Sequence, residues 1–97
     1  GEQRRDFTYV GDVVNANILA ATNPEDLKGE AFNIGNGDNY SVNELADMLG
    51  GKKSYGNKII EPFQTLADNS KALLILDWDP KGDLPTWIKK YKQLLEI

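Results

Sequence analysis

The side chains of this 97-residue chain that could do chemistry are mainly cations and carboxylates, because it contains neither cysteine nor histidine. Without cysteine there can be no disulfide, no thiol nucleophile and no thiolate metal site. Histidine is the side chain that titrates near neutral pH without help. Acid–base catalysis would therefore need a carboxylate, lysine or tyrosine with a strongly shifted pKa. We predict no metal site.

Two adjacent arginines, Arg4 and Arg5, are the first candidates for binding a ligand. They precede a short run rich in aromatic and β-branched residues. A planar guanidinium can hold phosphate oxygens through two parallel hydrogen bonds. Successive side chains of a strand point to opposite faces, so only one of the pair would face a given ligand. Solvated arginines on an exposed strand are the alternative, and the residues alone leave both interpretations open.

The turn Gly35-Asn36-Gly37 is a second candidate, because it lies between an expected strand and an expected helix. That setting resembles the glycine-rich loop that binds dinucleotides. The third glycine of that loop is replaced by Tyr40, whose bulk would obstruct close packing of strand and helix. We therefore favour a polar turn over a phosphate-binding loop.

Composition narrows the classes of partner. The chain is 40% hydrophobic and 27% charged, with a net charge of −4, as expected of an ordinary globular protein. This charge argues against nucleic acid or an anionic membrane as a partner. The longest apolar run, Ala72 to Leu76, is too short to span a bilayer. The polar N-terminus is not a signal peptide. We therefore expect a cytoplasmic location.

Periodicity and capping residues predict an alternation of strands and helices. The predicted strands cover about 7–10, 31–34 and 58–60, and the predicted helices about 13–21, 42–49, 70–76 and 84–97. The expected helix caps are Asp12, the Ser41–Glu44 capping box, Asp68 or Asn69, and Asp83. The expected apolar stripes of the second and last helices are Val42, Leu45, Ala46 and Leu49, and Leu84, Trp87, Ile88, Tyr91, Leu94 and Leu95.

This order of elements predicts the α/β class. The strands at 7–10 and 31–34 would flank a helix in a βαβ-like unit. A parallel sheet needs more strands than three and helices on both faces. The chain therefore looks like the end of a larger sheet.

Three stretches, in this order, resemble one family. They are R-D-F-x-x-V-x-D-V-x-x-A from Arg5, F-N-I-G-x-G-x-x-x-S-V-x-E-L-A from Phe32, and E-P-x-x-T-x-A-D-x-S-K-A from Glu61. They are similar to the second half of the extended short-chain dehydrogenases. Within these, the NAD-dependent nucleotide-sugar epimerases and dehydratases match best, UDP-glucose 4-epimerases most of all.

The resemblance implies a fold and a binding role. Residues 1–40 would form the end of a Rossmann-type parallel sheet, and residues 41–97 a small α/β substrate-binding lobe. Arg5 would contact the diphosphate of a nucleotide sugar. A second family arginine falls at Lys58, which can pair with phosphate but lacks the guanidinium fork. The glycine that precedes the family's tryptophan is replaced by Asp77, before Trp78.

The resemblance also implies what these residues lack. The family's catalytic pair is Tyr-x-x-x-Lys, and no tyrosine of this chain is followed by lysine at that spacing. We therefore assign no catalytic and no cofactor-binding residue here. NAD would belong to the whole enzyme, and a missing N-terminal Rossmann half would be the chain's partner. Exposed sheet edges predict that the isolated chain self-associates or is loosely ordered before about residue 40. The alternative is a stand-alone α/β module without catalysis.

Overall fold

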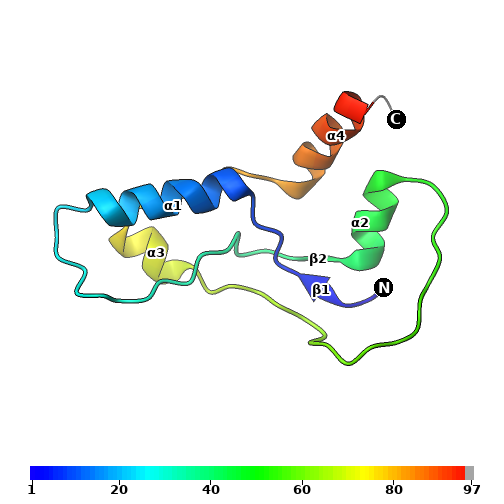
Figure 1. Ribbon diagram of the computed structural model, residues 1–97, viewed down its shortest axis with the longest axis horizontal. Coiled ribbons are helices and arrows are strands. Elements are labelled where there is room, and N and C mark those ends of the chain that lie inside the picture. The colour runs from blue at the N-terminus through cyan, green and yellow to red at the C-terminus, as the bar shows by residue number, and fades with distance from the viewer. Residues whose placement is uncertain (96–97) are drawn as a thin grey trace.

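The computed structural model describes residues 1–95 as a thin, extended body. Its elements are β1 (Arg4–Arg5), α1 (Val10–Thr22), β2 (Tyr40–Ser41), α2 (Val42–Leu49), α3 (Ser70–Ile75) and α4 (Leu84–Leu95) (Figure 1). The Cα extents are 50 × 34 × 15 Å, with a radius of gyration of 16.3 Å. A compact domain of this length would have a radius of gyration of about 13 Å. The chain is therefore too flat to enclose a large core.

The sheet is small and antiparallel. Strands β1 and β2 pair with Arg4 opposite Ser41 and Arg5 opposite Tyr40. A third segment joins the other edge of β1, where Arg4 N donates to Phe63 O at 2.7 Å and Thr65 N donates to Arg4 O at 3.0 Å. Strand β1 therefore connects the N-terminus to two distant parts of the chain.

The three predicted strands at 7–10, 31–34 and 58–60 are absent from the part of the chain described, so those predictions are wrong. These segments have the residue composition of strands, but a strand forms only when a second segment completes its hydrogen bonds. No such ladder runs beside these segments, and Val10 begins α1 instead. The predicted parallel βαβ unit is likewise not formed, and the coarse α/β class rests on the helices and the β1–β2 pair.

Helix α1 begins three residues before the predicted start, with Tyr9 at the N-cap position. Asp12, the predicted cap, lies inside the first turn and is buried. Its carboxylate accepts hydrogen bonds from Lys81 N at 3.0 Å and from Gly82 N at 2.7 Å. The prediction was wrong because a distant backbone, rather than the helix's own amides, takes this carboxylate. The predicted end before Pro24 is confirmed.

Helices α2 and α4 pack together near the C-terminus (Figure 1). The capping box of α2 is confirmed: Glu44 N donates to Ser41 Oγ at 3.0 Å, and Ser41 N to Glu44 Oε1 at 3.2 Å. In α4, Asp83 accepts from Thr86 N at 3.1 Å, as its predicted cap role requires. Residues 96–97 of the predicted helix lie outside the described residues. The expected stripes are only partly covered, since Ile88 alone of them is buried.

The core lies between α1 and α3. It consists of Ala16, Ala72, Leu76 and Trp78. Trp78 is completely buried, and its Nε1 donates to Asp12 O at 2.8 Å. The residue before it, Asp77, has φ 54°, a left-handed conformation that asparagine and aspartate tolerate better than other non-glycine residues. The position at which the family has glycine thus keeps the conformation that glycine favours.

Helix α3 ends at Ile75, one residue before the predicted end. Of its two predicted caps, Asp68 is the one whose carboxylate accepts from Ser70 N, at 3.1 Å. The Asn69 side chain instead donates to Gly35 O at 2.9 Å. The side chain that caps α3 therefore belongs to Asp68, the residue before the N-cap position.

Large apolar side chains remain exposed on several elements. Val10, Val14 and Ile18 form one stripe along α1, with exposed fractions of 69, 51 and 54%. Trp87 is 43% exposed and stacks on Tyr91, with ring centroids 4.9 Å apart. Exposed apolar surfaces of this kind are typical of sites that another molecule covers.

Candidate functional site

The two arginines of β1 lie on opposite faces of the strand. Arg4 is half-buried and bonds to the segment that leads into β2: its Nε donates to Asn39 Oδ1 at 2.9 Å, and its Nη2 donates to Asn39 O at 2.9 Å. Its Nη1 lies 2.7 Å from Glu44 Oε1, which makes an ion pair with the capping box of α2. Arg4 therefore joins β1, β2 and α2, and its guanidinium is committed to structure.

Glu44 is the acidic partner in this network. The backbone hydrogen bond from Ser41 and then the hydrogen bond from Arg4 lower its pKa below the ordinary 4.5. The charged form thus holds the start of α2 and the side chain of Arg4 together. Sequence reasoning found the capping box but missed the arginine, because nothing local links residues forty positions apart.

Arg5 points to the other face of β1, where its partners are fewer. Its Nη1 donates to Arg4 O at 2.7 Å, and its Nη2 lies 3.3 Å from Glu61 Oε2. The other oxygen of Glu61 accepts from Gln3 Nε2 at 2.6 Å. Gln3 and Arg5 are two residues apart in an extended segment, so they share a face. Arg4 engages three of its five N–H donors and Arg5 two, so Arg5 keeps more donors for a ligand.

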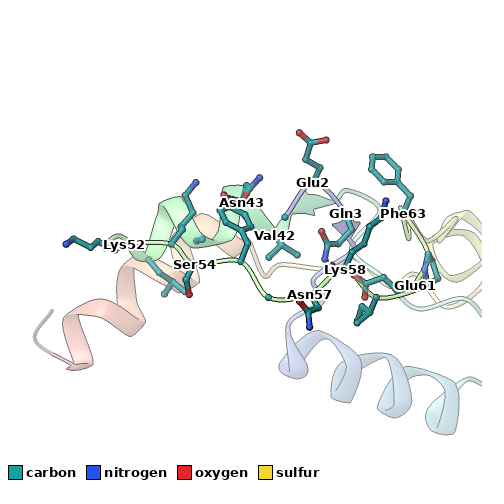
Figure 2. A pocket seen from close by; sticks show the side chains of 18 of the residues that line it. Glu2, Gln3, Val42, Asn43, Lys52, Ser54, Asn57, Lys58, Glu61 and Phe63 are labelled. Carbon is teal, nitrogen blue, oxygen red and sulfur yellow. Dashed lines mark hydrogen bonds between the residues drawn. The ribbon is translucent and has the colours of Figure 1, made fainter.

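An open cavity of about 1000 Å³ lies beside this face, between the start of the chain, α2 and the segment 50–63. Lys58, Gln3 and Glu61 lie at one end and Lys52 at the other (Figure 2). Arg5 is not among the lining residues, but it reaches the rim through its ion pair with Glu61. Of the two predicted site residues, Lys58 lines the cavity, whereas Arg5 is linked to it only through Glu61.

Asp6 is a residue whose role sequence reasoning missed. Its carboxylate accepts from Asn36 N at 2.9 Å, from Gly37 N at 3.0 Å and from Ala67 N at 3.2 Å. The Thr8 hydroxyl donates to it at 3.3 Å. The signal was its place between Arg5 and Phe7 in the first motif.

The hydrogen bonds of Asp6 decide whether the turn Gly35-Asn36-Gly37 can bind a phosphate. A phosphate held by such a turn needs free backbone amides. The amides of Asn36 and Gly37 instead donate to Asp6, an anion supplied by the chain itself. Tyr40 occupies the position of the third glycine. The turn does not fit the pyrophosphate of NAD.

Tyr40 is a further titratable residue, at the start of β2. Burial, followed by the charges of Asp83, Asp38 and Glu44, raises the pKa of Tyr40 above 10.0, which moves its hydroxyl further from neutral titration. Residues 1–95 contain no group of three or more acidic residues placed to hold a metal ion. None of the helices in this range is both long enough and apolar enough to cross a bilayer.

Comparison with known proteins identifies what the chain is similar to. Residues 1–35 match the model of the NAD dependent epimerase/dehydratase family. The chain is 38% identical to a putative UDP-glucose 4-epimerase of Methanocaldococcus jannaschii, over 93% of this chain and 30% of that protein. It is 34% identical to the UDP-glucuronate 4-epimerase of Thermodesulfobacterium geofontis, over 93% of this chain and 29% of that protein.

Two solved structures share the fold over nearly the whole chain. The UDP-glucuronic acid 4-epimerase of Bacillus cereus, in complex with UDP-glucuronic acid and NAD, matches with a TM-score of 0.80 at 31% identity. MoeE5, in complex with the same two ligands, matches with a TM-score of 0.84 at 32% identity. Each comparison covers 98% of this chain, but 33% and 35% of the larger proteins. The chain spans about a third of the length of the relatives it matches.

Proposed function

The chain is a relative of the NAD-dependent epimerases and dehydratases, and we propose that it forms the C-terminal, substrate-binding part of such an enzyme, where it holds the diphosphate of a UDP-sugar. The observation that carries this proposal is the orientation of the arginine pair. Arg4 is committed to Asn39 and Glu44, whereas Arg5 lies on the opposite face. Arg5 is paired with Glu61, which lines the same open cavity as Lys58.

The two cations suit a diphosphate in different ways. Arg5 can offer parallel N–H donors to two phosphate oxygens, and Lys58 a single mobile ammonium. Their charges are separated around a cavity large enough for a ligand of this class. Nothing in the described chain neutralises Lys58 through an ion pair, so its charge is available to an anion.

The remainder of the enzyme would supply the cofactor and the catalytic groups. In this proposal residues 1–40 complete a Rossmann-type sheet and residues 41–97 form the substrate lobe. The exposed stripe Val10, Val14 and Ile18 and the thin body support it, since both need a covering layer. Because the turn at Gly35 does not fit NAD, we assign no step of its chemistry to these residues. Calorimetry of NAD against the chain should show no specific heat, and micromolar binding would overturn this assignment.

The binding role is tested by replacing each arginine. The host is a protein that joins this chain to the N-terminal two-thirds of the Bacillus cereus enzyme. Arg5→Ala should weaken UDP-sugar binding by roughly 10- to 150-fold, because a charged hydrogen bond contributes about 1.5–3 kcal/mol. Arg4→Ala is the matched control, which should lower stability and leave affinity nearly unchanged. Small and equal effects on affinity would return Arg5 to the class of solvated surface arginines.

A further inference from the structure

The guanidinium of Arg5 is held in place before any ligand arrives. One terminal nitrogen donates to Arg4 O at 2.7 Å, and the other lies 3.3 Å from Glu61 Oε2. Glu61 is itself fixed by Gln3, whose Nε2 donates to Oε1 at 2.6 Å. The three side chains are linked by contacts on one face of the strand, in the order Gln3, Glu61, Arg5.

The backbone brings Glu61 to this position. The segment that follows it is bound to one edge of β1 through both backbone groups of Arg4: Arg4 N donates to Phe63 O, and Thr65 N donates to Arg4 O. Gln3 is fixed by the pairing on the other edge of this strand, where its carbonyl accepts from Val42 N at 3.0 Å. The carboxylate therefore meets Arg5 because two backbone segments are paired, and not through a chance contact of a long side chain.

We propose that Glu61 is a positioning residue that orients Arg5 for its contact with the substrate diphosphate, a role that rests on the proposed function. Arginine loses much rotamer freedom when it binds, and a partner that orders it in advance reduces this loss. Two of the five N–H donors of a guanidinium are engaged here, which leaves the others for phosphate oxygens.

If Glu61 instead competed with the ligand for Arg5, its removal would change anion affinity in the opposite direction. A carboxylate beside a phosphate site also repels the ligand, so Glu61 could act as a competitor that occupies Arg5. Removing a competitor strengthens anion binding, whereas removing a positioning residue weakens it. The direction of the change therefore decides between the two.

The first experiment titrates UDP into the 97-residue chain and follows NMR shifts, with uridine as the probe that lacks phosphate. Glu61→Ala should weaken UDP binding by about 2- to 12-fold, the range for disordering one long side chain. Glu61→Gln should retain nearly full affinity, because its amide oxygen still accepts from Arg5 and the Gln3 amide can turn to match. Tighter binding or unchanged binding in Glu61→Ala would overturn the proposal.

The second experiment needs no ligand. The Nε–H group of Arg5 should be ordered in the wild-type chain and in Glu61→Gln, and mobile in Glu61→Ala, by nitrogen-15 relaxation. Glu2→Ala is the matched control: it removes the same charge from the same cavity without touching Arg5, and should leave that order unchanged. An Arg5 side chain equally ordered in Glu61→Ala would overturn the proposal. A wild-type chain that binds no UDP would count against the proposed function instead, and the relaxation data would decide the role of Glu61 separately.

Discussion

Replacing Asp6 by asparagine should destabilise the chain strongly, although the two side chains have the same shape. Asp6 Oδ1 accepts from Asn36 N and the Thr8 hydroxyl, and Oδ2 accepts from Gly37 N and Ala67 N. An asparagine amide must present its NH2 group to one of these pairs. The less costly orientation faces Asn36, since the hydroxyl of Thr8 can turn to accept.

The magnitude follows from the bonds that are lost. One backbone amide left without a partner costs about 1–3 kcal/mol. The two remaining bonds change from charge-assisted to neutral, at about 1 kcal/mol each. Because the site is partly open to water, we expect a net loss of about 2–4 kcal/mol. A chain of this length has a total stability of about 5–15 kcal/mol.

The assay is unfolding in urea, followed by the fluorescence of the fully buried Trp78. The matched control is Asp26→Asn, because Asp26 accepts one amide, Lys28 N, in an exposed loop. That variant should lose less than about 1 kcal/mol. If Asp6→Asn costs no more than the control, Asp6 does not hold these segments together and the argument is wrong.

Three further predictions concern other parts of the chain. Gly35→Ala should cost about 1–3 kcal/mol by overpacking, because an added Cβ would clash with the Cβ of Ala67 and would lie 2.9 Å from the carboxylate of Asp6. Gly56→Ala should be neutral because its surroundings are open, and equal unfolding midpoints for the two variants would contradict this prediction. The folded-state pKa of Glu44 is lowered, so its ionised form stabilises the chain above about pH 4.5 and this is lost as pH falls through the lowered value; Glu44→Gln should flatten that part of a urea-midpoint profile, and parallel profiles would refute it. The wild-type chain should self-associate in sedimentation, and Val14→Lys with Ile18→Lys should reduce its mass toward that of the monomer; a monomeric wild type would remove the case for a covering partner.

The sequence was a good guide where the determining contacts are local. The capping box of Ser41 and Glu44 and the cap at Asp83 form within a few residues, so their positions could be predicted directly. The end of α1 before Pro24 has the same origin, because proline restricts the residue before it. The family resemblance is confirmed as well, since motifs are a property of the chain and need no folding to be recognised.

The sequence failed where a second segment decides the outcome. The run Phe7 to Val10 has strand composition, but no neighbouring strand completes it, and its last residue starts a helix. Asp12 has the side chain of a cap, yet the amides of Lys81 and Gly82 take its carboxylate. In both cases the competing partner is far away in sequence, so no window around the residue contains it.

The candidate site shows the same division. Strand geometry and the family motif together single out Arg5 over Arg4, and both are available from the sequence. Only the tertiary structure decided what each arginine contacts: Asn39 and Glu44 take Arg4, and Glu61 holds Arg5 beside the cavity that Lys58 lines. These contacts join residues separated by more than thirty positions. They exist because backbone pairing across β1 brings three remote segments together, and pairing of that kind depends on the whole fold rather than on any local pattern.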